Sequence, residues 1–134
     1  MIAENERILA IAESVRKRFE KNPTDTLKCM CAIVSAELSE EMLKNGIDHM
    51  IRYAAGCHVF ITIGRNILDL TASQFGEDRI VYRPYYGKLE KEWYWRGVRC
   101  FSDSMQLIQY QHTTGWPLSQ IHPTLNNQWR KRVG

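Results

Sequence analysis

Hydrophobic residues recur at helical spacing along the first third of the chain. In residues 2–21 they lie three and four positions apart with charged residues between them, which predicts an amphipathic helix that Asn22-Pro23 ends. The apolar face of this helix consists of Ile8, Ile11, Ala12, Val15 and Phe19. A second helix is predicted up to Lys44, with Thr24 and Thr26 as candidate caps at its start. Its buried stripe consists of Cys31, Val34, Ser35, Leu38 and Met42.

From Ile47 onward the pattern changes from helical spacing to alternation. Asn45-Gly46 ends the second helix, because glycine readily takes the left-handed conformation found there. Residues 49–54 and 57–63 are predicted strands, and residues 67–71 return as the partner of the second one after a turn at Gly64-Arg65-Asn66.

The remaining chain gives weaker signals. Residues 79–86 predict another strand, and residues 99–112 a helix that Gly115-Trp116-Pro117 breaks. The last segment is expected to be irregular or partly helical. The order of these elements predicts a single α+β domain over residues 1–134, with N-terminal helices packed on a small antiparallel sheet.

Composition narrows the class of protein. A chain of 134 residues with 25% charged and 44% hydrophobic residues is typical of one globular domain. We find no apolar run near the ~20 residues that span a membrane, and no basic segment before an apolar one at the N-terminus. We therefore expect no membrane partner and a cytoplasmic protein, or one delivered to a host or target cell.

The net charge of +3 is too small to indicate a nucleic-acid partner, and the basic tail at Trp129–Arg132 is more typical of a solvated end. The four cysteines are Cys29, Cys31, Cys57 and Cys100. A zinc site was weighed and disfavoured. Cys57 and His58 are adjacent in a predicted strand and point to opposite faces, and Cys29 and Cys31 are two apart in a predicted helix. We expect no metal and no cofactor.

A histidine and an acid meet in the predicted hairpin. With Gly64-Arg65 as a two-residue loop, Phe60 lies opposite Asp69, so His58 and Asp69 share one face as diagonal neighbours. Asp69 interrupts an apolar strand, where a carboxylate is costly unless it is paired. The structural alternative is an acid bonded to Thr71 or to a backbone amide. His49, His112 and His122 have no evident acidic partner in the sequence.

Cys31 lies on the buried stripe near the start of its helix, where free amides and the helix dipole favour a thiolate. Its structural alternative is a small core residue. Cys29 is the competing thiol, on a less apolar row of the same predicted helix. Cys57 is predicted to point into the core, and Cys100 has no acid–base neighbours in the sequence.

Three short motifs supply a thiol, an imidazole and a carboxylate in chain order. They are Cys31-Ala-Ile-Val-Ser35, His58-Val-Phe60 and Leu68-Asp69-Leu-Thr71-Ala72-Ser73-Gln74-Phe75. Together they resemble the transglutaminase-like branch of the papain-like cysteine enzymes, in the small stand-alone versions found in bacteria and phages. The resemblance covers about residues 27–76. It implies a papain-like core, Cys31 as the nucleophile, His58 as the general base and acid, and Asp69 as the residue that orients His58.

The chain also departs from that family. Only 27 positions separate Cys31 and His58, so the insertions of larger relatives are missing. The glutamine that precedes the nucleophile in papain-type enzymes has no equivalent, since residues 22–30 offer only Asn22, Thr24 and Thr26. The backbone amide of Cys31 and the side chain of Gln74 are the candidate oxyanion donors; Gln74 could instead fix its own loop.

Two classes of function stay open at this point. The first is a cysteine-dependent acyl-transfer enzyme acting on an amide of a protein or peptide, as an amide hydrolase, glutamine deamidase, transglutaminase or peptidase. The second is a binding or regulatory protein on the same fold with an unused triad. The aromatic run Trp93-Tyr94-Trp95 could line a peptide groove or simply pack the core.

Overall fold

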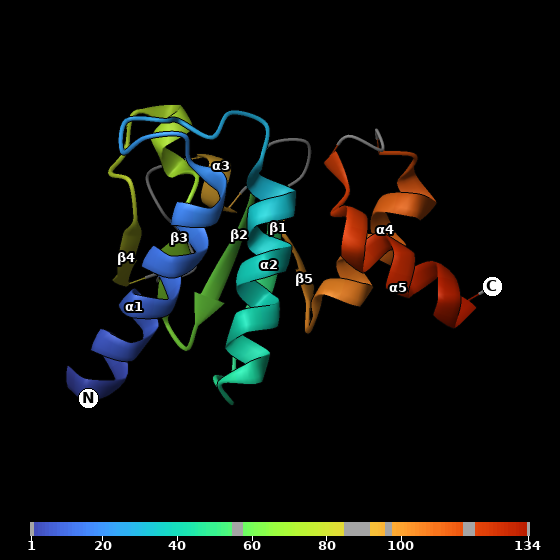
Figure 1. The fold of residues 1–134 in the computed structure, drawn as a ribbon, viewed down its shortest axis with the longest axis horizontal. Coiled ribbons are helices and arrows are strands. Elements are labelled where there is room, and N and C mark those ends of the chain that lie inside the picture. Colours follow the sequence, from blue (N-terminus) through green and yellow to red (C-terminus); the bar gives the residue numbers. More distant parts are fainter. Residues whose placement is uncertain (1, 55–57, 85–91, 96–97, 117–119, 134) are drawn as a thin grey trace.

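Two long helices lie side by side over one face of a sheet (Figure 1). The computed structural model describes residues 2–54, 58–84, 92–95, 98–116 and 120–133. Helix α1 spans Ile2–Phe19 and helix α2 spans Cys31–Lys44. Their facing side chains and those of the sheet form one buried cluster, which includes Ile8, Val15 and Leu38. The predicted stripes therefore identify the packed faces of both helices.

Within the described residues the sheet has five strands in the order β4-β3-β2-β1-β5, and each pair of neighbours is antiparallel. The strands are β1 (Met50–Ala54), β2 (His58–Ile63), β3 (Asn66–Asp69), β4 (Val81–Pro84) and β5 (Arg99–Phe101). The shorter helices are η1 (Ala72–Phe75), α3 (Glu92–Trp95), α4 (Ser104–Thr114) and α5 (Pro123–Val133). The predicted α+β class, with N-terminal helices on an antiparallel sheet, is confirmed.

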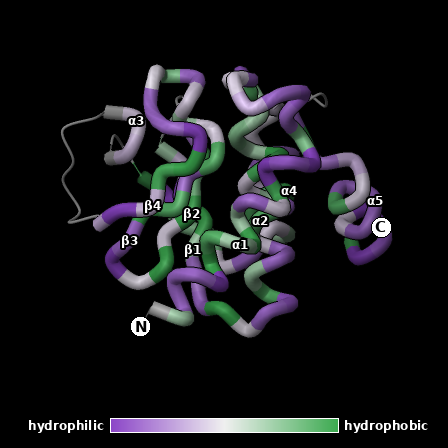
Figure 2. Tube along the Cα trace, turned by 60° about the vertical axis from the view of Figure 1, so that its left-hand side comes forward, coloured by the Kyte–Doolittle hydropathy of each residue, from purple (hydrophilic) through white to green (hydrophobic). Residues whose placement is uncertain are grey.

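The two faces of the sheet carry different cores. Val59, Ile61 and Leu68 belong to the large cluster under α1 and α2, and the intervening residues of the strands point the other way. On that second face Phe60 and Ile67 pack against Tyr94 of α3. Hydrophobic segments accordingly run through the middle of the molecule (Figure 2). The second face is where the predicted acid–base residues lie.

Two predicted boundaries are wrong. Helix α2 begins at Cys31, so neither Thr24 nor Thr26 caps it, because Leu27 and Cys29 have left-handed φ angles of 51° and 64° that a helix cannot contain. Residues 99–101 form strand β5, which pairs with β1, and the helix begins only at Ser104. The last segment agrees with the expectation of partial helix, because residues Pro123–Val133 form α5.

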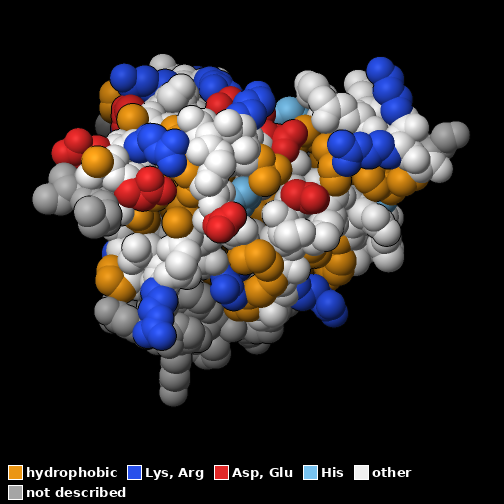
Figure 3. All heavy atoms as spheres, turned by 90° about the horizontal axis from the view of Figure 1, so that it is seen from below, with side chains coloured by type: hydrophobic (Ala, Val, Ile, Leu, Met, Phe, Trp, Pro, Cys, Tyr) orange, Lys and Arg blue, Asp and Glu red, His pale blue; other side chains and the backbone are white. Residues whose placement is uncertain are grey.

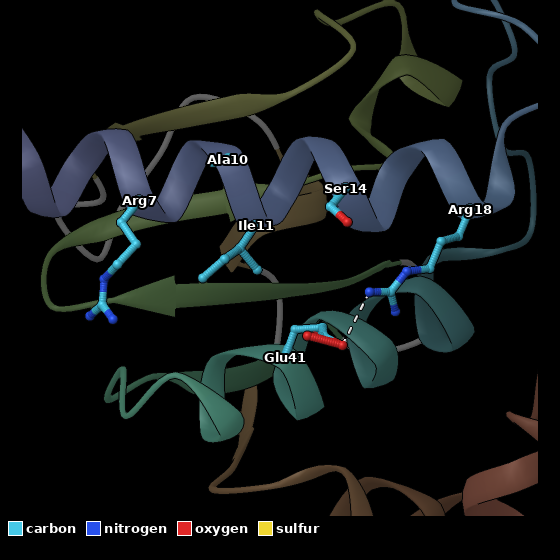
Figure 4. Close-up of a pocket in the computed structure, with 6 residues that line it drawn as sticks. All are labelled: Arg7, Ala10, Ile11, Ser14, Arg18 and Glu41. Atoms are coloured by element: carbon cyan, nitrogen blue, oxygen red, sulfur yellow. Dashed lines mark hydrogen bonds and ion pairs between the residues drawn. The ribbon is translucent and has the colours of Figure 1, made fainter.

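The helical face of the molecule carries a small groove. A groove of about 220 Å³ lies between α1 and α2, where Arg18 binds Glu41 at 3.1 Å, and none of the predicted site residues lines it (Figure 4). At the end of the molecule seen in Figure 3, basic and acidic side chains of the described residues are interspersed. Among the helices that the structure describes, none combines the length and apolar character that crossing a membrane requires.

Candidate active site

The hairpin of β2 and β3 brings a histidine and an acid together. Ile63 pairs with Asn66 and Ile61 with Leu68, so the loop is the two residues Gly64-Arg65, and Gly64 has the positive φ of 57° that such short loops favour. In this register His58 Nε2 lies 2.6 Å from Asp69 Oδ2. The predicted hydrogen bond across the hairpin is confirmed.

The second oxygen of Asp69 is also occupied. Oδ1 accepts a hydrogen bond from the Thr71 amide at 2.9 Å, with the Thr71 hydroxyl at 3.4 Å. The carboxylate of Asp69 therefore makes both predicted bonds at once: the local bond to Thr71 and the bond to His58. This division fixes the plane of the carboxylate and leaves Oδ2 for the imidazole.

Burial and charge decide the protonation of this pair. The exposed fractions of His58 and Asp69 are 0% and 2%. Burial lowers the pKa of His58, but the charge and hydrogen bond of Asp69 outweigh it and raise that pKa to about 10. Burial raises the pKa of Asp69, and the attraction of His58 more than reverses this, so the net shift is downward. The pair is thus an imidazolium and a carboxylate at neutral pH.

Aromatic rings enclose the pair. Phe75 meets the His58 ring edge-on at 5.1 Å, Phe60 stacks on it at 5.9 Å, and Tyr94 lies at 6.0 Å. The Tyr94 hydroxyl also lies beside Asp69 and helps to lower its pKa. Burial, followed by the Asp69 charge, raises the pKa of Tyr94 well above its usual range. These rings keep water from the ion pair, which strengthens it.

The thiol of Cys31 completes the group from the other side of the sheet. Cys31 is the first residue of α2, is half-buried, and lies close enough to His58 to raise the pKa of the imidazole. Since Nε2 is bonded to Asp69, Nδ1 is the nitrogen left for the thiol; it is buried and has no other hydrogen-bond partner among the described residues. Ser35, one turn further, anchors α2 to the Val59 carbonyl at 3.1 Å.

The sequence predicts Cys29 in the same helix as Cys31, and this prediction is wrong because α2 begins at Cys31. Cys29 is exposed in the loop before α2, and its left-handed backbone directs its amide toward Gln74, whose Oε1 accepts from it at 3.4 Å. The other half of the Gln74 carboxamide, Nε2, is buried without a hydrogen-bond partner in the described part of the chain. Gln74 therefore presents an oriented, unused donor at the end of η1, next to the start of α2.

The remaining candidates lie elsewhere or have other partners. Cys57 lies outside the described residues, and Cys100 is exposed on β5, where its sulfur is 3.2 Å from the Arg52 guanidinium. His122 does have an acidic partner, Glu37 on α2 at 3.0 Å, which the sequence could not reveal because 85 positions separate them. No cluster of three His, Cys, Asp or Glu side chains that could hold a metal occurs among the residues described.

Sequence reasoning missed three residues of this region. The sequence does not distinguish a site role from a core role for Tyr94, which lies in an aromatic run, and Phe75 only ends the motif that contains Asp69. Arg16 was placed among the polar residues of α1, yet its side chain is fully buried and bonds to the segments on both sides of the site. In the sequence, the burial of Arg16 is indicated only by its position next to the buried Val15, and this signal is weak.

Comparisons with known proteins add no name to this geometry. The chain matches no protein-family model, no curated protein and no solved structure.

Proposed function

We propose that the chain is a cysteine-dependent acyl-transfer enzyme with a transglutaminase-like or papain-like core. The observation that carries the proposal is the buried His58–Asp69 bond of 2.6 Å with the Cys31 thiol beside the same imidazole. Burying an acid and a histidine is costly, and their pairing next to a thiol matches the order nucleophile, base and orienting acid. The helix that opens with Cys31 and packs on antiparallel strands supports the papain-like arrangement.

The first half-reaction forms a thioester. An imidazolium beside a thiol favours the thiolate, so the Cys31 sulfur attacks the carbonyl carbon of a protein or peptide amide. The carbonyl electron pair moves onto oxygen and returns as the C–N bond breaks. His58 donates its proton to the departing nitrogen, which leaves as ammonia or an amine. Asp69 stays ionised throughout and holds the ring in place.

The second half-reaction releases the acyl group. Water or an amine attacks the thioester carbonyl, His58 takes its proton, and the C–S bond breaks to restore the Cys31 thiolate beside the imidazolium. Water gives hydrolysis or glutamine deamidation, and an amine gives transfer. No cofactor enters either step. The three free thiols of the described chain suit a reducing compartment such as the cytoplasm, where a catalytic thiol stays reduced.

The oxyanion formed in both steps needs donors. No side chain caps the first turn of α2, so its backbone amides are free to donate, and that of Cys31 is adjacent to the reacting sulfur. We propose Gln74 Nε2 as the second donor, because Cys29 already fixes the other end of its carboxamide.

Alkylation tests the nucleophile. We expect iodoacetamide at pH 7 to label Cys31 about tenfold faster than the exposed thiols Cys29 and Cys100, because the buried His58 imidazolium lies beside Cys31. The Arg52 guanidinium beside Cys100 lies at an exposed position, where solvent screens its charge. Fragment-ion mass spectrometry separates the cysteines. Cys31→Ser should keep the melting temperature and abolish ammonia release from a panel of peptide and glutamine amides.

Two outcomes would overturn the enzyme proposal. Labelling of Cys31 no faster than that of Cys100 would favour a binding or regulatory protein with an unused triad. Full activity of Cys31→Ser would exclude Cys31 as the nucleophile.

A further inference from the structure

Arg16 is a buried arginine whose hydrogen bonds leave its own helix. Its side chain is 0% exposed on α1. One guanidinium nitrogen donates to the Leu70 carbonyl and, at 3.1 Å, to the Ser73 hydroxyl, and the other donates to the Asp25 carbonyl. Nε binds Glu20 at 2.7 Å. A buried guanidinium is costly unless every donor is used, so its placement calls for a reason beyond packing.

Apart from Glu20, the hydrogen-bond partners of Arg16 belong to the two segments that build the proposed site. Asp25 lies in the loop that leads to Cys31, while Leu70 and Ser73 follow Asp69 and lead to Gln74. We name this arrangement the Arg16 clasp: the guanidinium with the Asp25 carbonyl, the Leu70 carbonyl and the Ser73 hydroxyl. Ser73 also donates to the Thr26 carbonyl at 3.1 Å, which joins the same two segments directly.

The Arg16 guanidinium is part of a larger network of ion pairs. Glu20 binds both Arg16 and Arg79, and Arg79 also binds Glu13 at 2.6 Å. The hydrogen bond of Arg79 lowers the pKa of Glu20, so the carboxylate stays charged beside Arg16. The clasp therefore rests on a network that spans α1 and the residues before β4.

The first turn of α2 depends on this support. Met30 precedes the helix without any side-chain cap, and the loop before it contains two left-handed residues, Leu27 and Cys29. An uncapped helix start frays unless its entering backbone is held. The clasp holds that backbone at Asp25 and Thr26, against the turn that carries Gln74.

We propose that Arg16 is a positioning residue that sets the start of α2, and with it the Cys31 thiol, relative to the His58–Asp69 pair and Gln74. This inference rests on the proposed function, because it assigns Arg16 a role in that same site. Arg16 itself touches none of the reacting atoms. It acts through the two backbone segments that it joins.

The test compares Arg16→Lys with Arg18→Lys in the full chain. Lysine keeps the charge but has one nitrogen, which cannot reach both segments at once. Arg18 lies on the same helix and binds Glu37 and Glu41, so Arg18→Lys is a matched control that leaves the clasp intact. Ser73→Ala is the milder second variant, which decides the question if Arg16→Lys does not fold.

Two readouts are taken on each variant: hydrogen exchange of residues 24–31 and 70–76, and the iodoacetamide rate of Cys31 relative to Cys100 across pH. We expect faster exchange in both segments for Arg16→Lys and Ser73→Ala. We expect the relative rate of Cys31 to fall about tenfold in Arg16→Lys, and less in Ser73→Ala, with a changed pH profile. Arg18→Lys should change neither readout.

The outcomes separate this inference from the proposed function. Faster exchange with an unchanged Cys31 rate and pH profile would make Arg16 purely structural and overturn the inference. Unchanged exchange would show that the clasp does not hold the segments. A wild-type Cys31 no faster than Cys100 would overturn the proposed function, and the positioning role with it, whereas the exchange data would still show whether the clasp exists.

Discussion

At the scale of residues, Asp69 shows how one carboxylate can serve the fold and the proposed chemistry together. Oδ1 closes a local turn onto Thr71, and Oδ2 binds the imidazole of His58. The bond to Thr71 already restricts the rotamers of the Asp69 side chain, so pairing with His58 costs little additional side-chain entropy. Removing the charge should therefore affect both stability and turnover.

The sign of the pH dependence follows from the raised pKa of His58. Folding raises it from 6.5 to about 10, so the folded state holds a proton that the unfolded state releases above pH 6.5. The stability from this pair is complete below pH 6.5 and is lost as the pH rises toward 10. On the acid side, the lowered pKa of Asp69 means that its contribution is lost only below its ordinary value of 3.8.

We therefore expect Asp69→Asn to be least stable relative to wild type between about pH 4 and 6.5. The difference in free energy of unfolding should shrink steadily toward pH 10, because the wild-type imidazolium is then lost. Urea unfolding of both proteins at several pH values measures it. A difference that stays constant from pH 6 to 10 would contradict the charged state assigned to His58. Turnover of Asp69→Asn should fall but not vanish.

At the scale of elements, the short turn η1 joins the acid of the site to its proposed oxyanion donor. Gln74→Glu tests that role, because glutamate keeps the acceptor for the Cys29 amide and replaces the donor Nε2 with oxygen. We expect turnover to fall about 10²–10³-fold, since the oxyanion loses one donor. Alkylation of Cys31 forms no oxyanion and should change little. Equal loss in both assays would mean that Gln74 only fixes its loop.

The elements also show what the sequence could and could not predict. The hairpin register was predictable, because the two-residue loop at Gly64 and the alternation of β2 leave one pairing that puts His58 and Asp69 on one face. The start of α2 was not, because the left-handed residues before Cys31 are a leucine and a cysteine rather than glycines. Strand β5 was missed since its three residues form a strand only by pairing with β1.

Long-range contacts decided the rest of the site. Arg16 meets Leu70 and Ser73 across more than fifty positions, and no local pattern marks an arginine that will be buried. Tyr94 joins Asp69 from a four-residue helix whose position depends on the second face of the sheet. Local periodicity therefore locates Cys31, His58 and Asp69, while the residues that enclose and position them emerge only from tertiary packing.

At the scale of the whole molecule, the C-terminal helices continue the core of the N-terminal ones. Leu125 of α5 and Leu107 of α4 belong to the same buried cluster as Leu38 of α2. The hydrogen bond between His122 Nε2 and Glu37 Oε2, at 3.0 Å, joins the start of α5 to α2. This continuity predicts that the chain unfolds as one cooperative unit, although the proposed site occupies only one end of it.

Leu125→Ala tests that unity. Leu125 is 3% exposed, so the cavity left by truncation should lower the free energy of unfolding by about 2–4 kcal/mol. If the chain is one unit, the loss of helix signal and the loss of the fast alkylation of Cys31 should shift together to lower urea concentrations, although Cys31 lies on α2 and Leu125 on α5. Arg130→Ala, on the exposed side of α5, should change stability by less than about 0.5 kcal/mol. A variant in which α5 melts early while Cys31 keeps its wild-type profile would instead divide the chain into two units, with the proposed chemistry confined to the first.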